Sequence, residues 1–457
     1  MSLSSEVAVS DPPIREPLVR PGDDALMRKV AVRLIPFLFF LYVIAYLDRV
    51  NVGFAKLAMA KDLNFSETEY GIGAGIFFIG YFLFEVPSNL LLQRFGARRW
   101  IMRIMVSWGL VAMGMLFVNS VPSFYLLRFL LGLAEAGFFP GILLYLTFWF
   151  TAKERAKMIA WFMTANAVSF IVGGPLSGWL MTSKFIPGLT GWQQMFLLEG
   201  LPAVLMAFVV LAYLPDGPRN ASWLTEAEKD RVQERLREER RSAQVRSDPG
   251  GEEKGHLTDI LRYPSVWVLC GCYFFFVVGM YGISLWLPQL IQRIGNLTPL
   301  QTGFLSAVPY LISGTFLVMN GYHSDRTGER PLHIFVPALF GAAGLVGCAF
   351  LENPALSLAS LSLAASGMWA MLGPFWAMAK QALGQRGAIA VAGGLAMINS
   401  VGNLGGFLGP YAIGYVKDAT RSFAYGLILL AVSVLIGAVL ALVAGRMENR
   451  QSPVDVT

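Results

Sequence analysis

The sequence predicts an all-α membrane protein with twelve transmembrane helices, arranged as two pseudo-symmetric six-helix bundles. Three observations lead to this fold class: the composition is apolar, long apolar runs recur along the chain, and short motifs repeat between its two halves. Of the 457 residues, 55% are hydrophobic and only 14% are charged. This composition is too apolar for an average soluble protein, so we expect the chain to fold in a lipid bilayer.

A membrane-spanning helix needs about 20 mostly apolar residues, and twelve runs approach or exceed that length. They lie near 31–54, 70–93, 99–118, 122–149, 157–181, 193–214, 264–289, 299–321, 331–351, 354–379, 388–416 and 422–444. These runs divide the chain into an N-terminal tail (1–29), a six-helix bundle (30–214), a linker (215–262), a second bundle (263–445) and a C-terminal tail (446–457).

Loop charges predict the orientation, because cytoplasmic loops are rich in Lys and Arg. The first 30 residues contain no apolar core, so we expect no cleaved signal peptide and a cytoplasmic N-terminus. With residue 1 inside, 28 of the 36 Lys and Arg residues fall in inner segments, while Arg49 and Arg128 lie within helices. The other six fall in outer loops: Lys56, Lys61, Lys184, Arg293, Lys417 and Arg421. Both termini are therefore expected in the cytoplasm.

Several function classes are excluded by composition and motifs. The net charge of +6 follows from the loop topology, and no basic soluble face suited to nucleic acid is present. The three cysteines fall in apolar runs, and the histidines lack metal-ligand spacing. Because neither a nucleotide-binding loop nor a catalytic cluster occurs, we expect no metal, no cofactor, no ATP-driven pump and no enzyme.

The linker is the largest soluble segment between the runs. Its sequence Thr225-Glu-Ala-Glu228 matches a helix-start capping box, and the charged run from Lys229 to Arg241 follows. Positive and negative charges nearly cancel across the linker. We therefore expect a solvated helix here, with a regulatory site as the alternative.

Matching motifs in the two halves indicate a duplication. Arg94-Phe-Gly96-Ala-Arg98 follows the second run, and Asp325-Arg326-Thr-Gly328-Glu-Arg330 follows the eighth. Likewise, Gly174-Pro175 in the fifth run corresponds to Gly409-Pro410 in the eleventh. Small residues and prolines at equivalent places are typical of helix bundles that pack backbone to backbone.

The acidic inner loop around Asp325, Arg326 and Arg330 resembles the signature loop of the major facilitator superfamily, where such residues serve as an inner gate. One departure is Gln93, where the first-half loop of that superfamily usually carries Asp. Four further motifs resemble its anion:cation symporter branch: Tyr46-Leu-Asp48-Arg49-Val-Asn51, Gly80-Tyr-Phe-Leu-Phe-Glu85-Val-Pro-Ser-Asn89, Arg128-Phe-Leu-Leu-Gly132-Leu-Ala-Glu135-Ala-Gly137 and Gly191-Trp-Gln-Gln-Met-Phe-Leu-Leu-Glu199-Gly-Leu-Pro202. That branch includes bacterial carriers for tartrate, sugar acids and aromatic acids, and is similar to animal sialic-acid and vesicular glutamate carriers. The resemblance implies a proton-coupled carrier of the bacterial inner membrane, and we expect a monomer.

Charged residues well inside the runs form the candidate site, because such charges are costly in a membrane and nearly always face a bundle interior or a wet cavity. Arg128 and Glu135 are two helical turns apart and share one face. Asp48 and Arg49 lie past the middle of the first run. If the first and fourth helices line one cavity, two arginines and two carboxylates converge there.

Each of these residues suits a task in anion transport. The planar fork of an arginine grips a carboxylate through two hydrogen bonds, so Arg49, helped by Arg128, is the expected substrate site. Glu135, desolvated at mid-membrane, is expected to exchange protons, and Asp48 would tune this chemistry or compete with substrate for an arginine. Acidic and basic residues of the first and fourth helices play such roles in the resembled family. The alternative is that these four form buried ion pairs that lock the fold.

Aromatic and polar residues are expected to complete the pocket, since small-molecule sites combine apolar walls with a few polar groups. For the two tryptophans the alternative is ordinary packing, and the two asparagines of run 11 could contact substrate or each other. Glu85 could act as a gate, a packing charge or a coupling site, and Glu199 is expected to face outer water at a helix end. The pocket candidates are Tyr81, Asn166, Trp369, Trp376, Asn399 and Asn403.

The sequence thus predicts a secondary active transporter that imports a small organic carboxylate with protons by alternating access. Tartrate, a sugar acid and an aromatic acid all fit. The alternative is a proton-driven exporter, because the stretch from Gly173 to Gly178 partly resembles a pattern linked to antiporters. The in-membrane arginines favour anions over the cationic drugs typical of exporters.

Overall fold

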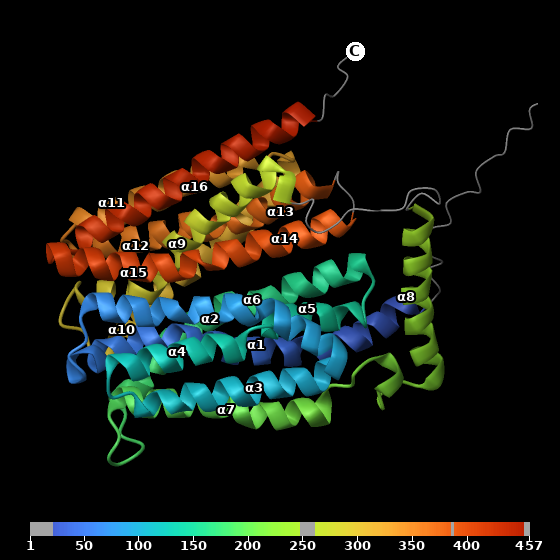
Figure 1. The fold of residues 1–457 in the computed structure, drawn as a ribbon, viewed down its shortest axis with the longest axis horizontal. Helices are drawn as coiled ribbons and strands as arrows, with labels where there is room; N and C mark the ends of the chain where they lie inside the picture. The colour runs from blue at the N-terminus through green and yellow to red at the C-terminus, as the bar shows by residue number, and fades with distance from the viewer. Residues whose placement is uncertain (1–21, 247–260, 385–387, 452–457) are drawn as a thin grey trace, which may run out of the picture.

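The computed structural model describes residues 22–246, 261–384 and 388–451, and all regular secondary structure in these ranges is helical. Two helix bundles lie side by side, one built from α1 to α7 and the other from α9 to α16 (Figure 1). The helix α8 runs across one end of the molecule (Figure 1). The expected all-α fold class is confirmed.

The first half of the chain contains seven α-helices and one short 3-10 turn. Its elements are α1 (Asp23–Asp62), α2 (Glu67–Phe95), α3 (Ala97–Gly114), the turn Met115–Phe117, α4 (Val121–Glu135), α5 (Phe138–Thr147), α6 (Ala152–Thr182) and α7 (Gly191–Tyr213). A 3-10 turn (Pro218–Asn220) and α8 (Glu226–Arg246) follow. The second half contains α9 (Pro264–Gln292), α10 (Pro299–Thr327), α11 (Pro331–Phe350), α12 (Pro354–Ala370), α13 (Leu372–Gly384), α14 (Ala388–Asn403), α15 (Gly405–Thr420) and α16 (Phe423–Gln451).

Eleven segments of the described chain are long and apolar enough to cross a membrane. Two of them are broken crossings, formed by α4 with α5 and by α12 with α13. The apolar run at 388–416 folds as α14 and α15, which have 16 residues each and are too short to be counted alone. Together they would supply a twelfth crossing, which stays a prediction, as does the cytoplasmic placement of both termini.

Small residues allow the helices of each half to cross closely. A Cβ atom on Gly132 of α4 would overlap the backbone oxygen of Phe77 in α2, and one on Gly80 would overlap that of Phe129. In the second half, a Cβ on Gly409 would overlap the backbone oxygen of Val278 in α9. Backbone approach of this kind replaces the hydrophobic driving force that is absent between helices in lipid.

Close backbone contact at glycines also joins the two halves, along the helix pairs α6 with α10 and α2 with α15. A Cβ on Gly174 would lie 2.6 Å from the backbone oxygen of Gly303, and a Cβ on Gly71 would lie 2.6 Å from that of Pro410. These contacts lie toward the loops that the charge distribution predicts to be extracellular, which we call the outer end. The halves touch at the outer end and diverge toward the end that carries α8 (Figure 1).

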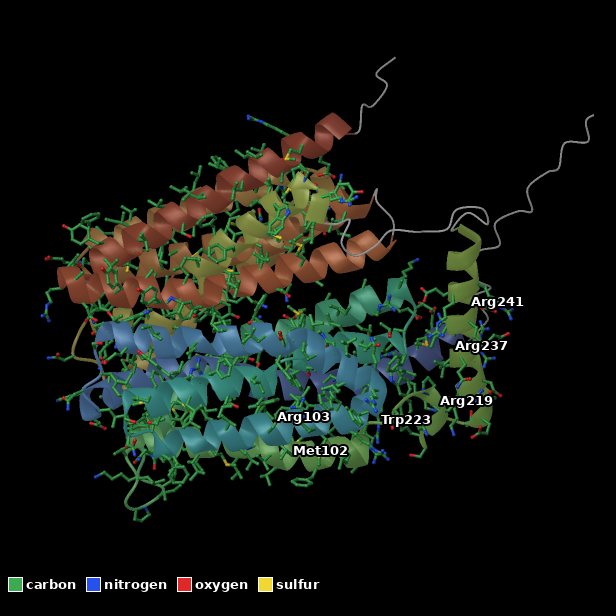
Figure 2. The ribbon with its side chains drawn as sticks, viewed as in Figure 1. Met102, Arg103, Arg219, Trp223, Arg237 and Arg241 are labelled. Carbon is green, nitrogen blue, oxygen red and sulfur yellow. The ribbon has the colours of Figure 1, made fainter. Side chains whose placement is uncertain are left out.

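The linker forms the expected helix with the expected capping box: the Thr225 N–H donates to Glu228 Oε2 (2.8 Å), and the Glu228 N–H donates to Thr225 Oγ1 (3.3 Å). Ion pairs attach α8 to the inner end of the first half, while Arg237 and Arg241 are exposed on it (Figure 2). The attaching pairs are Lys29–Glu228 (2.8 Å), Asp23–Arg231 (2.6 Å) and Glu154–Arg235 (2.8 Å).

Candidate functional site

The fourth crossing is interrupted immediately after Glu135. Helix α4 ends there, Ala136 adopts φ −54° and ψ 132°, and Gly137 adopts a left-handed φ of +88° before α5 begins. A Cβ at position 137 would collide with Ser88 of α2, so both the backbone angle and the close approach require glycine. Interrupted crossings are common at transporter binding sites, because half-helix ends expose polar backbone groups there.

Glu135 is bound to Arg49 of α1 by an ion pair inside the first half. Arg49 Nε and Nη2 lie 2.8 Å and 2.6 Å from the same carboxylate oxygen, Glu135 Oε1. The other oxygen, Oε2, is buried without a hydrogen-bond partner in the described part of the chain. The Arg49 side chain is 13% exposed and that of Glu135 is 2% exposed, so the arginine is the partner closer to open space.

Aromatic rings surround the Arg49 guanidinium group. Its central carbon lies 4.9 Å from the ring centre of Tyr46, 5.1 Å from that of Tyr81 and 5.4 Å from that of Phe77. These distances are within the range of cation–π attraction. The rings hold the planar guanidinium group in place without neutralising its charge.

Arg128 also approaches the Phe77 ring, with its central carbon 5.1 Å from the ring centre. Its Nε donates to the backbone oxygen of Gly73 (3.2 Å), and its Nη2 donates to that of Ala74 (3.0 Å). Its Nη1 is buried and has no partner among the described residues. The structure therefore brings Arg49 and Arg128 to the same aromatic ring, and Glu135 to Arg49.

Asp48 is 1% exposed and faces a different neighbour. Its carboxylate accepts hydrogen bonds from Trp108 Nε1 of α3 (2.6 Å) and from Asn51 Nδ2 (3.3 Å). None of the ion pairs in the described part of the chain includes Asp48. The competition expected between Asp48 and substrate for an arginine therefore has no contact in this structure to support it.

Glu199 corrects one expectation from the sequence. It is 2% exposed, lies well inside α7, and accepts a hydrogen bond from Ser177 Oγ of α6 (2.8 Å). The expectation that it faces outer water is therefore wrong. The reason is that the helix begins at Gly191, well before Glu199, and α6 packs against it at this depth.

Glu85 connects the two halves. Its carboxylate accepts hydrogen bonds from Asn399 Nδ2 (3.1 Å) and from Ser400 Oγ (3.5 Å) of α14. Asn399 thus bonds to Glu85 in this structure, while Asn403 is partly buried. Asn166 of α6 is 9% exposed, and its side-chain oxygen has no partner among the described residues.

Aromatic side chains form a second connection between the halves. Phe170 of α6 stacks on Tyr310 of α10 with a ring distance of 4.3 Å, and Trp369 meets Phe170 edge-on at 5.2 Å. The indole N–H of Trp369 is buried without a partner in the described ranges. Trp376 packs 4.8 Å from Tyr273 within the second half. Trp369 of the second half is therefore packed against Phe170 of the first half.

The profile of the Major Facilitator Superfamily matches residues 38–410. The chain belongs to this superfamily. Among its relatives, a "Putative tartrate transporter" of Agrobacterium vitis is 46% identical over 93% of this chain and 92% of the relative. A "Quinolone resistance transporter" of Acinetobacter baumannii is 39% identical over 93% of this chain and 96% of the relative.

Solved structures of superfamily members share the fold. A bacterial homolog of the human lysosomal transporter Spinster, in an inward-facing and unoccupied conformation, superposes with a TM-score of 0.76 at 16% identity and covers 94% of this chain and 99% of the neighbour. The chain is a multi-pass membrane transporter of the superfamily and not an enzyme, as the sequence predicts. Among its described residues, no three or more His, Cys, Asp or Glu side chains gather as metal ligands.

The signature loop of this superfamily member folds on itself. Arg330 Nη1 lies 2.7 Å from Asp325 Oδ1 and donates to Ser324 Oγ (2.9 Å), whereas Arg326 is exposed. In the first-half loop, the Arg98 N–H donates to Asp216 at the start of the linker (3.2 Å). Whether these loops gate the transporter stays a prediction.

Sequence reasoning named Tyr81 as a pocket residue but missed the other aromatic partners of the charged residues. Tyr46 lies three residues before Arg49 and so on the same helix face, which is a signal that could have been used. Phe77 and Trp108 come from other helices, and no local spacing marks them. Phe170 and Tyr310 come from opposite halves, so their contact depends on how the halves dock.

Proposed function

We propose that this transporter is a monomeric secondary carrier that imports a small organic carboxylate together with protons. The observation that carries the proposal is the ion pair between Arg49 and Glu135, buried in the membrane interior and surrounded by aromatic rings. An arginine neutralised only by a carboxylate that can be protonated is suited to exchange that partner for a carboxylate substrate.

The exchange couples the anion to the proton. In the structure, Glu135 neutralises Arg49 through one oxygen. A proton added to Glu135 removes its negative charge, so the guanidinium group then needs another anion. A substrate carboxylate supplies it through two parallel hydrogen bonds. When the proton leaves, Glu135 competes again for Arg49 and the substrate is released.

The surrounding groups support a small, hydroxylated or aromatic acid. Three buried polar groups have no hydrogen-bond partner among the described residues and could bind such an acid: Nη1 of Arg128, the side-chain oxygen of Asn166 and the indole N–H of Trp369. Tyr81 packs against Arg49, and Asn399 of the second half donates to Glu85 of the first. The relatives named as tartrate transporters favour this substrate class.

A proton-coupled exporter is the second candidate. It is favoured by the relative named for quinolone resistance, which covers nearly the whole chain. The two candidates differ in the direction of substrate movement. An importer carries its substrate inward together with protons, whereas an exporter carries its substrate outward in exchange for protons that enter.

The decisive experiment is uptake into proteoliposomes. Purified transporter is reconstituted, and radiolabelled tartrate, a sugar acid and an aromatic acid are offered with and without an inwardly directed proton gradient. We expect accumulation of at least one carboxylate above equilibrium, and only with the gradient. Absence of carboxylate uptake, combined with proton-driven quinolone efflux, would favour the exporter.

A further inference from the structure

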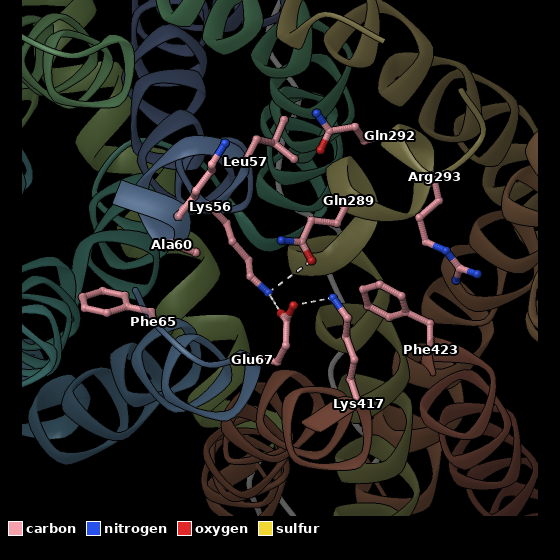
Figure 3. A pocket seen from close by; sticks show the side chains of 11 residues that line it. Lys56, Leu57, Ala60, Phe65, Glu67, Gln289, Gln292, Arg293, Lys417 and Phe423 are labelled. Atoms are coloured by element: carbon pink, nitrogen blue, oxygen red, sulfur yellow. Dashed lines mark hydrogen bonds and ion pairs between the residues drawn. The ribbon is translucent and has the colours of Figure 1, made fainter. Parts of the chain in front are cut away.

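The outer end contains a pocket between the two halves, with a volume of about 430 Å³ (Figure 3). Helices α1, α2, α9 and α15, with Arg293 directly after α9, contribute its polar side chains. The charged ones are Lys56, Lys61, Glu67, Arg293 and Lys417, and Gln289 and Gln292 add two amides.

The outer pocket concentrates positive charge. The sequence assigns six basic residues to the outer loops, and four of them line this one pocket, against the single carboxylate of Glu67. Outer loops are normally poor in Lys and Arg, so this gathering is not explained by topology. A cavity lined by one sign of charge attracts ions of the opposite sign.

Glu67 links the halves by accepting bonds from two lysines. Lys56 of α1 donates to one of its oxygens and Lys417 of α15 donates to the other (Figure 3). Lys56 also donates to Gln289 Oε1 (3.1 Å). These bonds join helices α1 and α2 of the first half to α9 and α15 of the second.

Lys56 is a buried cation that faces the pocket. Its side chain is 1% exposed, and its ammonium nitrogen lies 3.5 Å from the ring centre of Trp286. Glu67 is its only bonded counter-charge in the described part of the chain. A second anion would strongly stabilise the charge of an ammonium group that is held away from water in this way.

Two further carboxylates, Asp418 and Asp62, accept hydrogen bonds from groups other than these two lysines, although the charge of Asp418 also acts on Lys56. Asp418 accepts the backbone N–H groups of Glu67 (3.2 Å) and Thr68 (2.7 Å) at the start of α2. Asp62 accepts from Trp192 Nε1 (2.9 Å). Lys61 and Arg293 have no ion-pair partner among the described residues, so their charges are available to a ligand.

We propose that the outer pocket is a second anion site, at which an incoming small carboxylate docks before it reaches Arg49. The carboxylate first meets Lys61 and Arg293 and then competes with Glu67 for Lys56 and Lys417. Once Glu67 is displaced, the ionic link between the halves is lost and the outer end can open. This inference rests on the proposed function, since it takes the substrate to be an organic anion.

The first test measures uptake from each side of oriented vesicles, with tartrate as the probe. Lys61→Gln combined with Arg293→Gln should raise the KM for tartrate offered at the outer side roughly threefold or more, because the attracting charge is reduced. The KM at the inner side should stay within about twofold. The control is Lys184→Gln, which removes an exposed outer lysine that does not line the pocket. An unchanged outer KM in the double variant would overturn the proposal.

A sharper test removes opposite partners of the same bridge. Glu67→Gln and Lys417→Gln both break the link between the halves, and both side chains are partly exposed, so folding should survive. An anion site requires the outer KM to fall for Glu67→Gln and to rise for Lys417→Gln. A purely structural latch requires both to shift in the same direction, and that result would refute the site.

Chemical labelling separates this site from the transport function. Tartrate should slow acylation of Lys61 and Lys417 by an impermeant amine reagent, measured by mass spectrometry, and leave Lys184 unaffected. Protection without transport would retain the outer pocket and refute the proposed function. Transport without protection would retain the function and refute the pocket.

Discussion

Two nitrogen atoms of the Arg49 guanidinium group contact one oxygen of Glu135, and three aromatic rings lie around this group. Both features depend on the planar guanidinium group rather than on its charge alone. A lysine would keep the charge but lose the fork and most of the ring contact. If Arg49 binds the substrate as proposed, the shape of its side chain as well as its charge should determine the affinity for a carboxylate.

Arg49→Lys should raise the KM for the transported carboxylate about tenfold or more, because one charge-assisted hydrogen bond is worth about 1.5–3 kcal/mol. The measurement is uptake in proteoliposomes over a range of substrate concentrations. Arg103→Lys is the matched control, since Arg103 lies on α3, outside the site (Figure 2). An unchanged KM for Arg49→Lys would place the anion site elsewhere.

Sequence reasoning could find the charged residues of the site but not the direction of each side chain. Charges in a long apolar run are conspicuous, which is how Asp48, Arg49 and Glu135 are recognised. Successive residues on a helix point about 100° apart, so Asp48 and Arg49 cannot both face the same group. In the structure, Arg49 points toward Glu135 and Asp48 points toward Trp108. How the helices pack determines these directions.

At the scale of elements, the crossing of α6 and α10 closes the outer end. Gly174 and Gly303 face each other with backbone in contact, and Gly178 meets Pro299 nearby. A side chain at these positions would hold the halves apart without disturbing either bundle. The sequence indicated small-residue packing at Gly174-Pro175, but not that the partner lies in the other half.

Gly303→Ala should therefore favour the conformation with an open outer end. Modification of a Gln289→Cys variant, at a partly buried position that lines the outer pocket, by an impermeant thiol reagent should become several-fold faster, because the backbone of Gly174 and Pro175 cannot yield to a methyl group. Gly314→Ala is the control on the same helix, since a Cβ there meets nothing within 4 Å. Equal modification rates in the two variants would contradict this role of the crossing.

The linker helix α8 should be held to the first half by ion pairs that respond to salt and acid. The Lys29 ammonium and the Thr225 N–H hold the pKa of Glu228 below its usual value of 4.5. Its contribution is therefore present above that usual value and lost as the pH falls through the lowered one. We expect protection of the α8 amides from hydrogen exchange, corrected for intrinsic rates, to be constant from about pH 5 to 8 and to decrease in about 1 M salt. Protection that ignores salt would show that apolar packing, not charge, holds α8.

At the scale of the whole molecule, the two halves are joined at the outer end and diverge toward α8 (Figure 1). The apolar runs and the repeated motifs predict the all-α fold and the superfamily, because each of these patterns can be recognised within a short stretch of the sequence. The closed end could not be predicted, because a transporter must adopt both arrangements with one sequence. Contacts such as Glu85 with Asn399 and Glu67 with Lys417 belong to one of them.

The measurement that tests the central claim most directly compares proton-driven accumulation by the native transporter, Glu135→Gln and the control Glu352→Gln, whose residue is exposed on an outer loop. A neutral side chain at position 135 can neither lose a proton nor reclaim Arg49. We therefore expect Glu135→Gln to exchange substrate across the membrane but to accumulate none along a proton gradient, while Glu352→Gln behaves like the native chain. Accumulation by Glu135→Gln equal to that of the native transporter would contradict the account.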